Sequence, residues 1–191
     1  MNHIASKNIE PRTNKLTNSH KVVGLEEAIR RTNLRNGMTI SFHHHFRGGD
    51  KVVNMVVDKL AQMGYKDLHL AASSLTDVHE PLIEHIRNGV ITRISTSGLR
   101  GRLAQEISFG LMKEPVVFRS HGSRASAIAN SEIHIDVAFL AASSSDPMGN
   151  AAGYSRSANA KSICGSIGYA LPDAQYADKV VIITADLVPY P

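Results

Sequence analysis

The sequence predicts an α/β domain with a mostly parallel sheet and helices on both of its faces. Short apolar segments alternate along the chain with segments whose apolar residues recur every three or four positions, which is typical of strand–helix–strand units. Aromatic residues make up 5% of the 191 residues and there is no tryptophan, so aliphatic side chains must fill the core. A Val- and Ile-rich parallel sheet covered by helices has such a core.

The predicted strands are short runs of mainly apolar residues: 38–42, 68–72, 90–95, 116–118, 135–140 and 180–183. The first predicted helix begins near Gly24 and ends at Asn36-Gly37. The second lies between Asp50, placed to cap its start, and Gly64, placed to end it. It carries the clearest i, i+3, i+4, i+7 stripe in the chain, formed by Val53, Val56, Val57 and Leu60. Further helices are expected at about 80–87, 99–111, 125–131 and 173–177.

Charge divides the chain into two parts. Residues 1–21 hold four basic residues and one acidic residue, which accounts for +3 of the total net charge of +4. This segment is polar and lacks apolar periodicity, so we expect residues 1–22 to form a flexible arm and residues 23–191 to form one domain. The domain has no cluster of Lys and Arg interleaved with aromatic residues, which argues against nucleic-acid binding.

Cysteine usage and hydropathy indicate a cytoplasmic protein. Cys164 is the only cysteine, so no intramolecular disulfide can form, which fits a reducing compartment. No apolar run approaches the roughly 18 residues of a membrane helix. The amino terminus has no apolar core of a secretory signal. We therefore expect a cytoplasmic location and no membrane partner.

Small polar and glycine-rich loops follow five of the predicted strands, at 43–50, 73–74, 96–101, 120–122 and 143–150. In an open α/β sheet, ligands bind beyond the carboxyl ends of the strands. The sequence therefore predicts a polar cleft at this edge of the sheet.

The first loop suits an anion. Gly48 and Gly49 allow close approach of the backbone, and they precede a helix whose N–H groups attract negative charge. Arg47 can hold a carboxylate or phosphate with two hydrogen bonds. Alternatively, the glycines form only a tight turn and Arg47 is solvated. The loop lacks the standard dinucleotide and nucleotide motifs.

The other candidate residues also have two interpretations each. Ser97, Gly98 and Arg100 form a second strand-to-helix turn with a cation, or Ser97 simply caps the helix. Asp146 and Asn150 belong either to a ligand-binding loop or to a simple turn.

Other kinds of chemistry have weaker support. On a strand, His43 and His45 share one face while His44 points away, and no H-E-x-x-H helix or second cysteine is present, which argues against a metal site. Cys164 has no evident base nearby, and no G-x-S-x-G motif is present. The sequence therefore contains no complete catalytic set.

Several segments resemble the citrate lyase alpha subunit family: residues 25–31, 36–44, 46–50, 81–87, 96–101, 135–140 and 164–170. The resemblance covers about residues 24–191. The turn formed by Asp146, Gly149 and Asn150 is similar to one shared more widely among coenzyme A transferases.

This resemblance implies a coenzyme A transferase-like fold, in which two similar α/β domains enclose the active site. It implies an enzyme that converts acetyl-carrier and citrate into citryl-carrier and acetate. The carrier is a partner gamma subunit with a phosphopantetheine-type group related to coenzyme A, and a beta subunit cleaves the citryl-carrier. No cofactor bound covalently to this chain is implied.

The resemblance also guides the choice of site residues. In related transferases a glutamate of the second domain attacks the thioester, and no such segment is present in these 191 residues, so no catalytic residue is assigned. We expect Arg47 and Arg100 to bind citrate carboxylates, and the Gly48 and Gly49 backbone to contact the thioester oxygen or a carboxylate. The remaining candidates would shape the cleft: Ser97, Gly98, His121, Asp146 and Asn150.

Two alternatives to this function stay open. One is a truncated fragment that binds ligand or subunits without turnover. The other is a carrier transferase directed to malonate.

Overall fold

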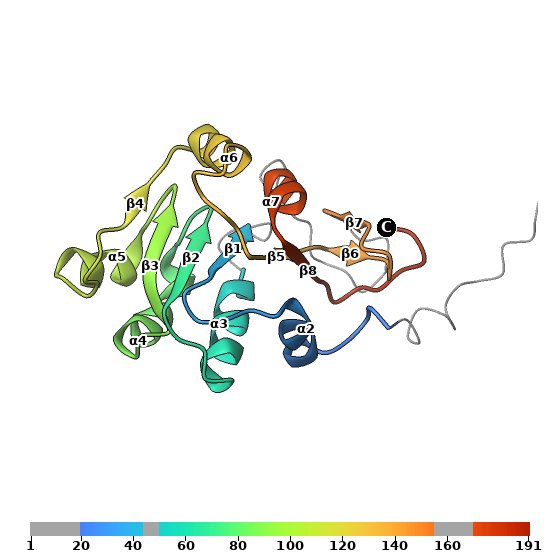
Figure 1. Cartoon of the computed structure of the whole chain (residues 1–191), viewed down its shortest axis with the longest axis horizontal. Helices are drawn as coiled ribbons and strands as arrows, with labels where there is room; N and C mark the ends of the chain where they lie inside the picture. Colours follow the sequence, from blue (N-terminus) through green and yellow to red (C-terminus); the bar gives the residue numbers. More distant parts are fainter. Residues whose placement is uncertain (1–19, 44–49, 155–169) are drawn as a thin grey trace, which may run out of the picture.

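A computed structural model describes residues 20–43, 50–154 and 170–191, and contains one sheet of six strands and one short hairpin (Figure 1). The sheet consists of β1 (Thr39–His43), β2 (Leu68–Ala72), β3 (Ile91–Thr96), β4 (Val117–Phe118), β5 (Val137–Ala141) and β8 (Lys179–Ile183). The hairpin joins β6 (Ser144–Ser145) and β7 (Ala151–Ala152). The helices are α2 (Leu25–Thr32), α3 (Val52–Gln62), the 3-10 turn η2 (Asp77–His79), α4 (Leu82–Arg87), α5 (Gly101–Ser108), α6 (His121–Ala129) and α7 (Ala170–Tyr176).

The sheet has the strand order β4-β3-β2-β1-β5-β8, and all of its neighbouring strands are parallel. The chain first moves from β1 outward to β4 and then returns to place β5 on the other side of β1. The order therefore reverses between β1 and β5. In this class of fold, ligands bind in the crevice beyond the carboxyl ends of the strands at such a reversal.

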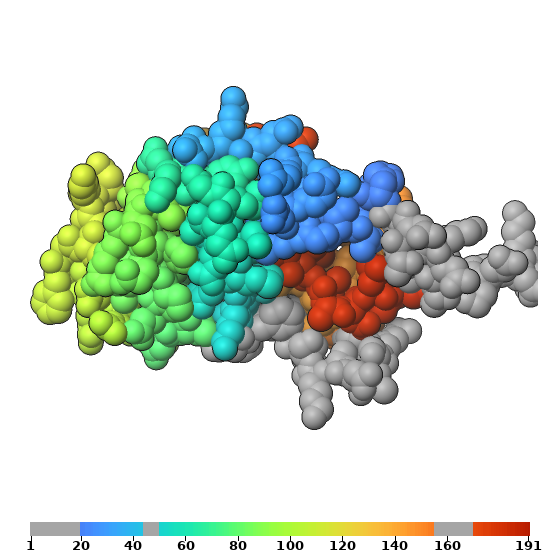
Figure 2. Space-filling model, turned by 90° about the horizontal axis from the view of Figure 1, so that it is seen from below, coloured from blue at the N-terminus to red at the C-terminus, as the bar shows by residue number. Residues whose placement is uncertain are grey.

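Helices cover both faces of the sheet, as predicted (Figure 1). Side chains of α2, α3, α4 and α5 share one apolar cluster with Ile40, Phe42 and Phe139. Figure 2 shows this face, where α2, α3 and α4 form a continuous layer beside the carboxyl-terminal segment. On the opposite face α6 packs on Ala71, Ala138 and Leu140. Among the described helices, none is long and apolar enough to cross a membrane.

The face toward α6 and α7 is unusually polar for a parallel sheet. On β1, Thr39, Ser41 and His43 alternate with Ile40 and Phe42, and all five are buried. Successive strand residues point to opposite faces, so the polar three share one face. Strands buried on both faces are usually continuous apolar runs, so this polarity calls for a local explanation.

Several predicted helix boundaries were wrong. Helix α2 ends at Thr32, before Asn36-Gly37, because Asn33 takes a left-handed conformation with φ of 57°. Helix α3 agrees with the prediction: Asp50 accepts a hydrogen bond from the Val52 N–H at 2.8 Å, and Gly64 follows the last turn with φ of +85°.

The remaining differences concern short elements. The expected helix near residue 80 begins at Leu82 after η2, and α5 is shorter than the expected 99–111. Helix α6 begins at His121 instead of near 125, because Ser120 accepts a hydrogen bond from the Ser123 N–H at 3.2 Å. Helix α7 begins at Ala170 instead of 173, and the β6–β7 hairpin was not predicted.

Candidate functional site

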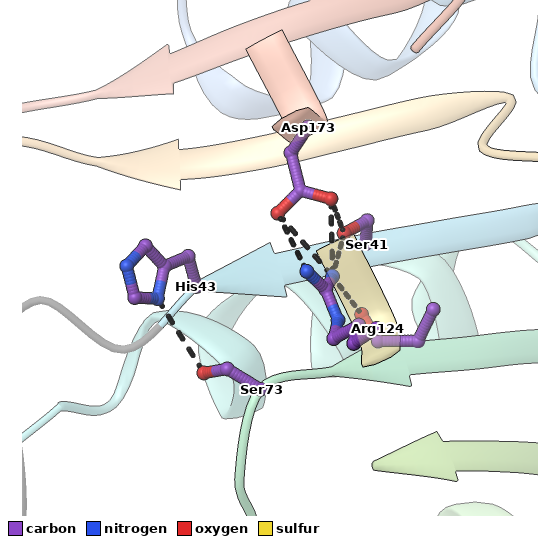
Figure 3. Close-up of polar contacts among 6 residues, drawn as sticks. Ser41, His43, Ser73, Arg124 and Asp173 are labelled. Atoms are coloured by element: carbon purple, nitrogen blue, oxygen red, sulfur yellow. Dashed lines mark hydrogen bonds and ion pairs between the residues drawn. The ribbon is translucent and has the colours of Figure 1, made fainter. Parts of the chain in front are cut away.

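The carboxyl ends of β1 and β2 bring His43 and Ser73 together beside the reversal of strand order. His43 is the last residue of β1 and is 6% exposed. Its Nδ1 lies 3.4 Å from the Ser73 Oγ (Figure 3). The sequence placed both residues in the polar loops of this edge but did not choose them as site residues.

Backbone hydrogen bonds join the loops that follow β2 and β3. The Ser97 N–H donates to the Ser73 carbonyl at 3.2 Å, and the Leu75 N–H donates to the Gly98 carbonyl at 2.8 Å. A Cβ at Gly98 would lie 3.3 Å from the Ser74 Oγ, so any side chain there would press on the neighbouring loop. Ser97 and Gly98 therefore belong to a loop that packs closely against the loop after β2.

Ser97 does not cap α5. The N-cap position of that helix is Arg100, and no side chain supplies a capping hydrogen bond. The Ser97 Oγ is buried and has no hydrogen-bond partner among the residues that the structure describes. The capping interpretation of Ser97 is therefore wrong.

Arg100 lies at the entrance to α5 and is exposed. It forms no ion pair with any described residue, whereas its neighbour Arg102 pairs with Glu80 at 2.8 Å. The next residue, Gly101, has φ of +70°, and a Cβ there would lie 2.0 Å from the Asp77 Oδ1. This close approach fixes the backbone immediately after Arg100.

The turn after β6 is held by hydrogen bonds among its own residues. The Asp146 Oδ1 accepts hydrogen bonds from the Met148 N–H at 2.8 Å and the Asn150 N–H at 3.0 Å, and Oδ2 accepts from the Asn150 side chain at 2.8 Å. Desolvation raises the pKa of Asp146, but these bonds outweigh it and hold the pKa below its usual value. These contacts show that Asp146 and Asn150 hold the turn together, and their role in shaping the cleft stays a prediction.

The structure places the described candidates at one edge of the sheet without joining them in a single contact network. His121 is the exposed first residue of α6. Arg47, Gly48 and Gly49 lie outside the described residues, as do two of the three adjacent histidines and Cys164. Their predicted roles stay predictions.

The opposite edge of the sheet carries a separate group of charged side chains. In the part of the chain that the structure describes, His134, Asp136 and Asp178 are the group whose donor atoms could hold a metal, all within 4.8 Å of one another. The His134 Nε2 lies 3.0 Å from the Asp178 Oδ2, which makes an ion pair when the histidine is protonated. A surface depression lined partly by Asp136 and Asp178 lies at this same edge. The possible metal-binding group and the depression both lie near the amino ends of β5 and β8, at the opposite edge from the predicted cleft.

A buried ion pair between α6 and α7 was not predicted from the sequence (Figure 3). Arg124 Nη2 donates to Asp173 Oδ1 at 3.0 Å, to the Ser41 Oγ at 2.8 Å and to the Ala71 carbonyl at 3.4 Å. The Ser41 hydroxyl donates to Asp173 Oδ1 at 2.7 Å. Arg124 and Asp173 are 2% and 0% exposed. Burial raises the pKa of Asp173, while Arg124 and then Ser41 act in the opposite direction.

The family model described as "Citrate lyase, alpha subunit (CitF)" matches residues 18–191 of the chain. The chain belongs to this family. It is 59% identical over 167 residues to the citrate lyase alpha chain of Escherichia coli, and 62% identical over 167 residues to that of Klebsiella pneumoniae. Both alignments cover 87% of this chain and 32% of the relative. The chain thus spans about a third of the length of these curated relatives.

Solved structures agree with this assignment. The crystal structure of a Streptococcus mutans citrate lyase alpha subunit, described as a complex with citrate, matches with a TM-score of 0.83 and 59% identity. The match covers 89% of this chain and 32% of the Streptococcus mutans chain. The malonate decarboxylase alpha subunit of Acinetobacter baumannii matches with a TM-score of 0.62 at 17% identity, over 86% of this chain and 28% of that one. The second likeness concerns the fold alone, and the expected α/β fold with a parallel sheet and helices on both faces is confirmed.

Proposed function

We propose that this chain forms the citrate-binding wall of a transferase that moves an acyl-carrier thioester from acetyl-carrier to citrate, giving citryl-carrier and acetate. The observation that carries the proposal is the 59% identity to a subunit whose crystal structure is described as a complex with citrate. The reversal of strand order between β1 and β5 supports the same edge as the binding site.

Within this wall, Arg47 and Arg100 bind citrate carboxylates, and the Gly48 and Gly49 backbone contacts the thioester oxygen or a carboxylate. The exposure of Arg100 and its lack of an ion pair with any described residue support this role, because its guanidinium is free to bind a ligand. The cleft is shaped by Ser97, Gly98, His121, Asp146 and Asn150. The residue that attacks the thioester belongs to a further segment of the family chain.

The proposal includes the molecular setting. Residues 23–191 act as one coenzyme A transferase-type domain in the cytoplasm, in a complex with a beta lyase subunit and a gamma carrier subunit. The thioester is carried on the phosphopantetheine-type group of the gamma subunit, and this chain holds no covalent cofactor.

Citrate binding to the chain can be measured by isothermal titration calorimetry, with Arg100→Ala as the test variant. A charged hydrogen bond contributes about 1.5–3 kcal/mol, so the dissociation constant should rise about 10- to 150-fold. Arg102→Ala is the matched control, because that neighbouring guanidinium is already paired with Glu80. Equal citrate affinity in wild type and Arg100→Ala would remove Arg100 from the site.

Turnover is tested by acetate release from acetyl-carrier on addition of citrate, with this chain alone and with the rest of a family chain supplied. Activity only after supplementation is the expected result. Activity of the chain alone would place the attacking residue within these 191 positions. Binding without turnover in both assays would favour the non-catalytic fragment, and preference for malonate in competition would favour the malonate-directed enzyme.

A further inference from the structure

The ion pair between Arg124 and Asp173 is buried between the helices α6 and α7 and the sheet, where its charges are removed from water. Apolar side chains, including Ala127, Ile128 and Leu140, also pack on this face of the sheet. Taking two charges out of water is costly, and replacing a buried pair by apolar residues is often neutral or stabilising. The Arg124 Nε is also buried without a hydrogen-bond partner among the described residues. Stability alone therefore does not account for this pair.

The geometry of the pair suggests what it does instead. One guanidinium group contacts α7 through Asp173, β1 through the Ser41 hydroxyl and β2 through the Ala71 carbonyl. Such forked, charge-assisted contacts fix direction as well as distance. The pair therefore fixes two neighbouring strands against both helices of this layer.

The two strands are fixed at a single row of the sheet. Ser41 and Ala71 are register partners across the parallel ladder. Residues two apart on a strand share a face, so the next row on this face holds His43 and Ser73. That row lies about 7 Å further along the strands, since each residue adds about 3.3 Å. The ion pair thus contacts the row of Ser41 and Ala71, which precedes the row of His43 and Ser73 at the candidate site.

We propose that Arg124 and Asp173 are positioning residues, whose ion pair holds the row of Ser41 and Ala71 and thereby keeps His43 and Ser73 aligned at the citrate-binding edge. The citrate part of this inference rests on the proposed function. The alignment of His43 and Ser73 does not, and it can be measured separately.

The main test replaces the pair by apolar residues in the double variant Arg124→Met/Asp173→Leu of the 191-residue chain. The midpoint of urea unfolding reports stability, and the imidazole resonances of His43, assigned with His43→Gln, report its surroundings. We expect an unchanged or higher midpoint, displaced His43 resonances and a citrate dissociation constant at least 10-fold higher. Unchanged His43 resonances in a stably folded double variant would overturn the proposal.

A second pair of variants keeps the proposal falsifiable if the double variant does not fold. Ser41→Ala leaves the ion pair in place but removes its hydrogen bond to β1, so the His43 resonances should shift. Ser95→Ala is the matched control, because the buried Ser95 hydroxyl on β3 is bonded instead to His69 of β2 (Oγ to Nε2, 2.9 Å). Equal His43 spectra in both variants would overturn the positioning role.

A conservative variant separates the effect of the directed hydrogen bonds of Arg124 from the effect of its charge. Arg124→Lys keeps the positive charge but loses the fork, so His43 resonances and citrate affinity should lie between those of wild type and the double variant. If wild type fails to bind citrate, the proposed function fails for this chain, while the His43 resonances still decide whether the pair positions this row.

Discussion

Replacing Gly101 by alanine tests the close approach between the start of α5 and η2. Two costs are expected. The first is conformational, because φ of +70° disfavours an L side chain by about 1–2 kcal/mol. The second is steric, because the new Cβ would lie 2.0 Å from the Asp77 Oδ1 and 3.1 Å from the Asp77 Cα. Over-packing typically costs about 1–3 kcal/mol, so Gly101→Ala should lower the free energy of unfolding by about 2–5 kcal/mol.

Gly89 offers a matched control for this measurement. It has the same φ of +70°, but a Cβ there would meet nothing within 4 Å. Gly89→Ala should therefore show the conformational cost alone, about 1–2 kcal/mol. Urea unfolding of both variants at neutral pH gives the two values. If Gly101→Ala is no more destabilising than Gly89→Ala, the contact with Asp77 does not constrain the loop that carries Arg100.

Three further predictions concern charged and polar side chains. Arg124→Met alone should lower the free energy of unfolding by about 3–5 kcal/mol, because Asp173 would stay buried without its cation; chemical denaturation checks this, and a loss below 1 kcal/mol would contradict it. Burial, and then Arg93, lower the pKa of His69 from 6.5 to about 4. The unfolded chain therefore binds more protons between these values, and stability should rise with pH across this window, by about 1–2 kcal/mol after solvent screening. Denaturation at pH 4.5 and 7 should show a smaller rise for His69→Gln, and an equal rise would exclude His69 as the cause. Asp146→Ala should cost about 1–3 kcal/mol at pH 7. Because the folded pKa of Asp146 is lowered, that cost should shrink as pH falls through it below about 3.8, and a constant difference from wild type down to pH 2 would refute the assignment.

Local sequence patterns were sufficient to predict the class of fold. The spacing of Val53, Val56, Val57 and Leu60 reflects one buried stripe on α3, and all four side chains are buried. Helix ends were harder, because they depend on single backbone conformations. Asn33 ends α2 with a positive φ that most residues avoid, whereas the Asn36-Gly37 pair three residues later is the more usual signal for a helix end.

The position of the candidate site at one edge of the sheet could be predicted, but the side-chain contacts beneath it could not. Parallel strands direct their carboxyl ends to one edge, so the loops could be grouped from sequence. The contact between Ser41 and Asp173 joins residues 132 positions apart, and no local pattern encodes it. One signal was present: polar residues alternate with Ile40 and Phe42 on a strand that is central in the sheet. A second signal was Arg124, which lies among Ala and Ser residues in the sequence of α6.

The strand order also has a consequence for biosynthesis. Strand β1 lies inside the finished sheet, but its neighbour β5 comes about a hundred residues later, as the hydrogen bond between Thr39 and Asp136 across 97 positions shows. At about 5–20 residues per second, a nascent chain leaves one edge of β1 unpaired for roughly 5–20 s. During that interval the apolar edge around Phe42 is open to pairing with other chains, until Phe139 stacks on it at a centroid distance of 5.5 Å. Variants that weaken β5 should therefore reduce the yield of folded protein more than they reduce the thermal stability of the molecules that do fold.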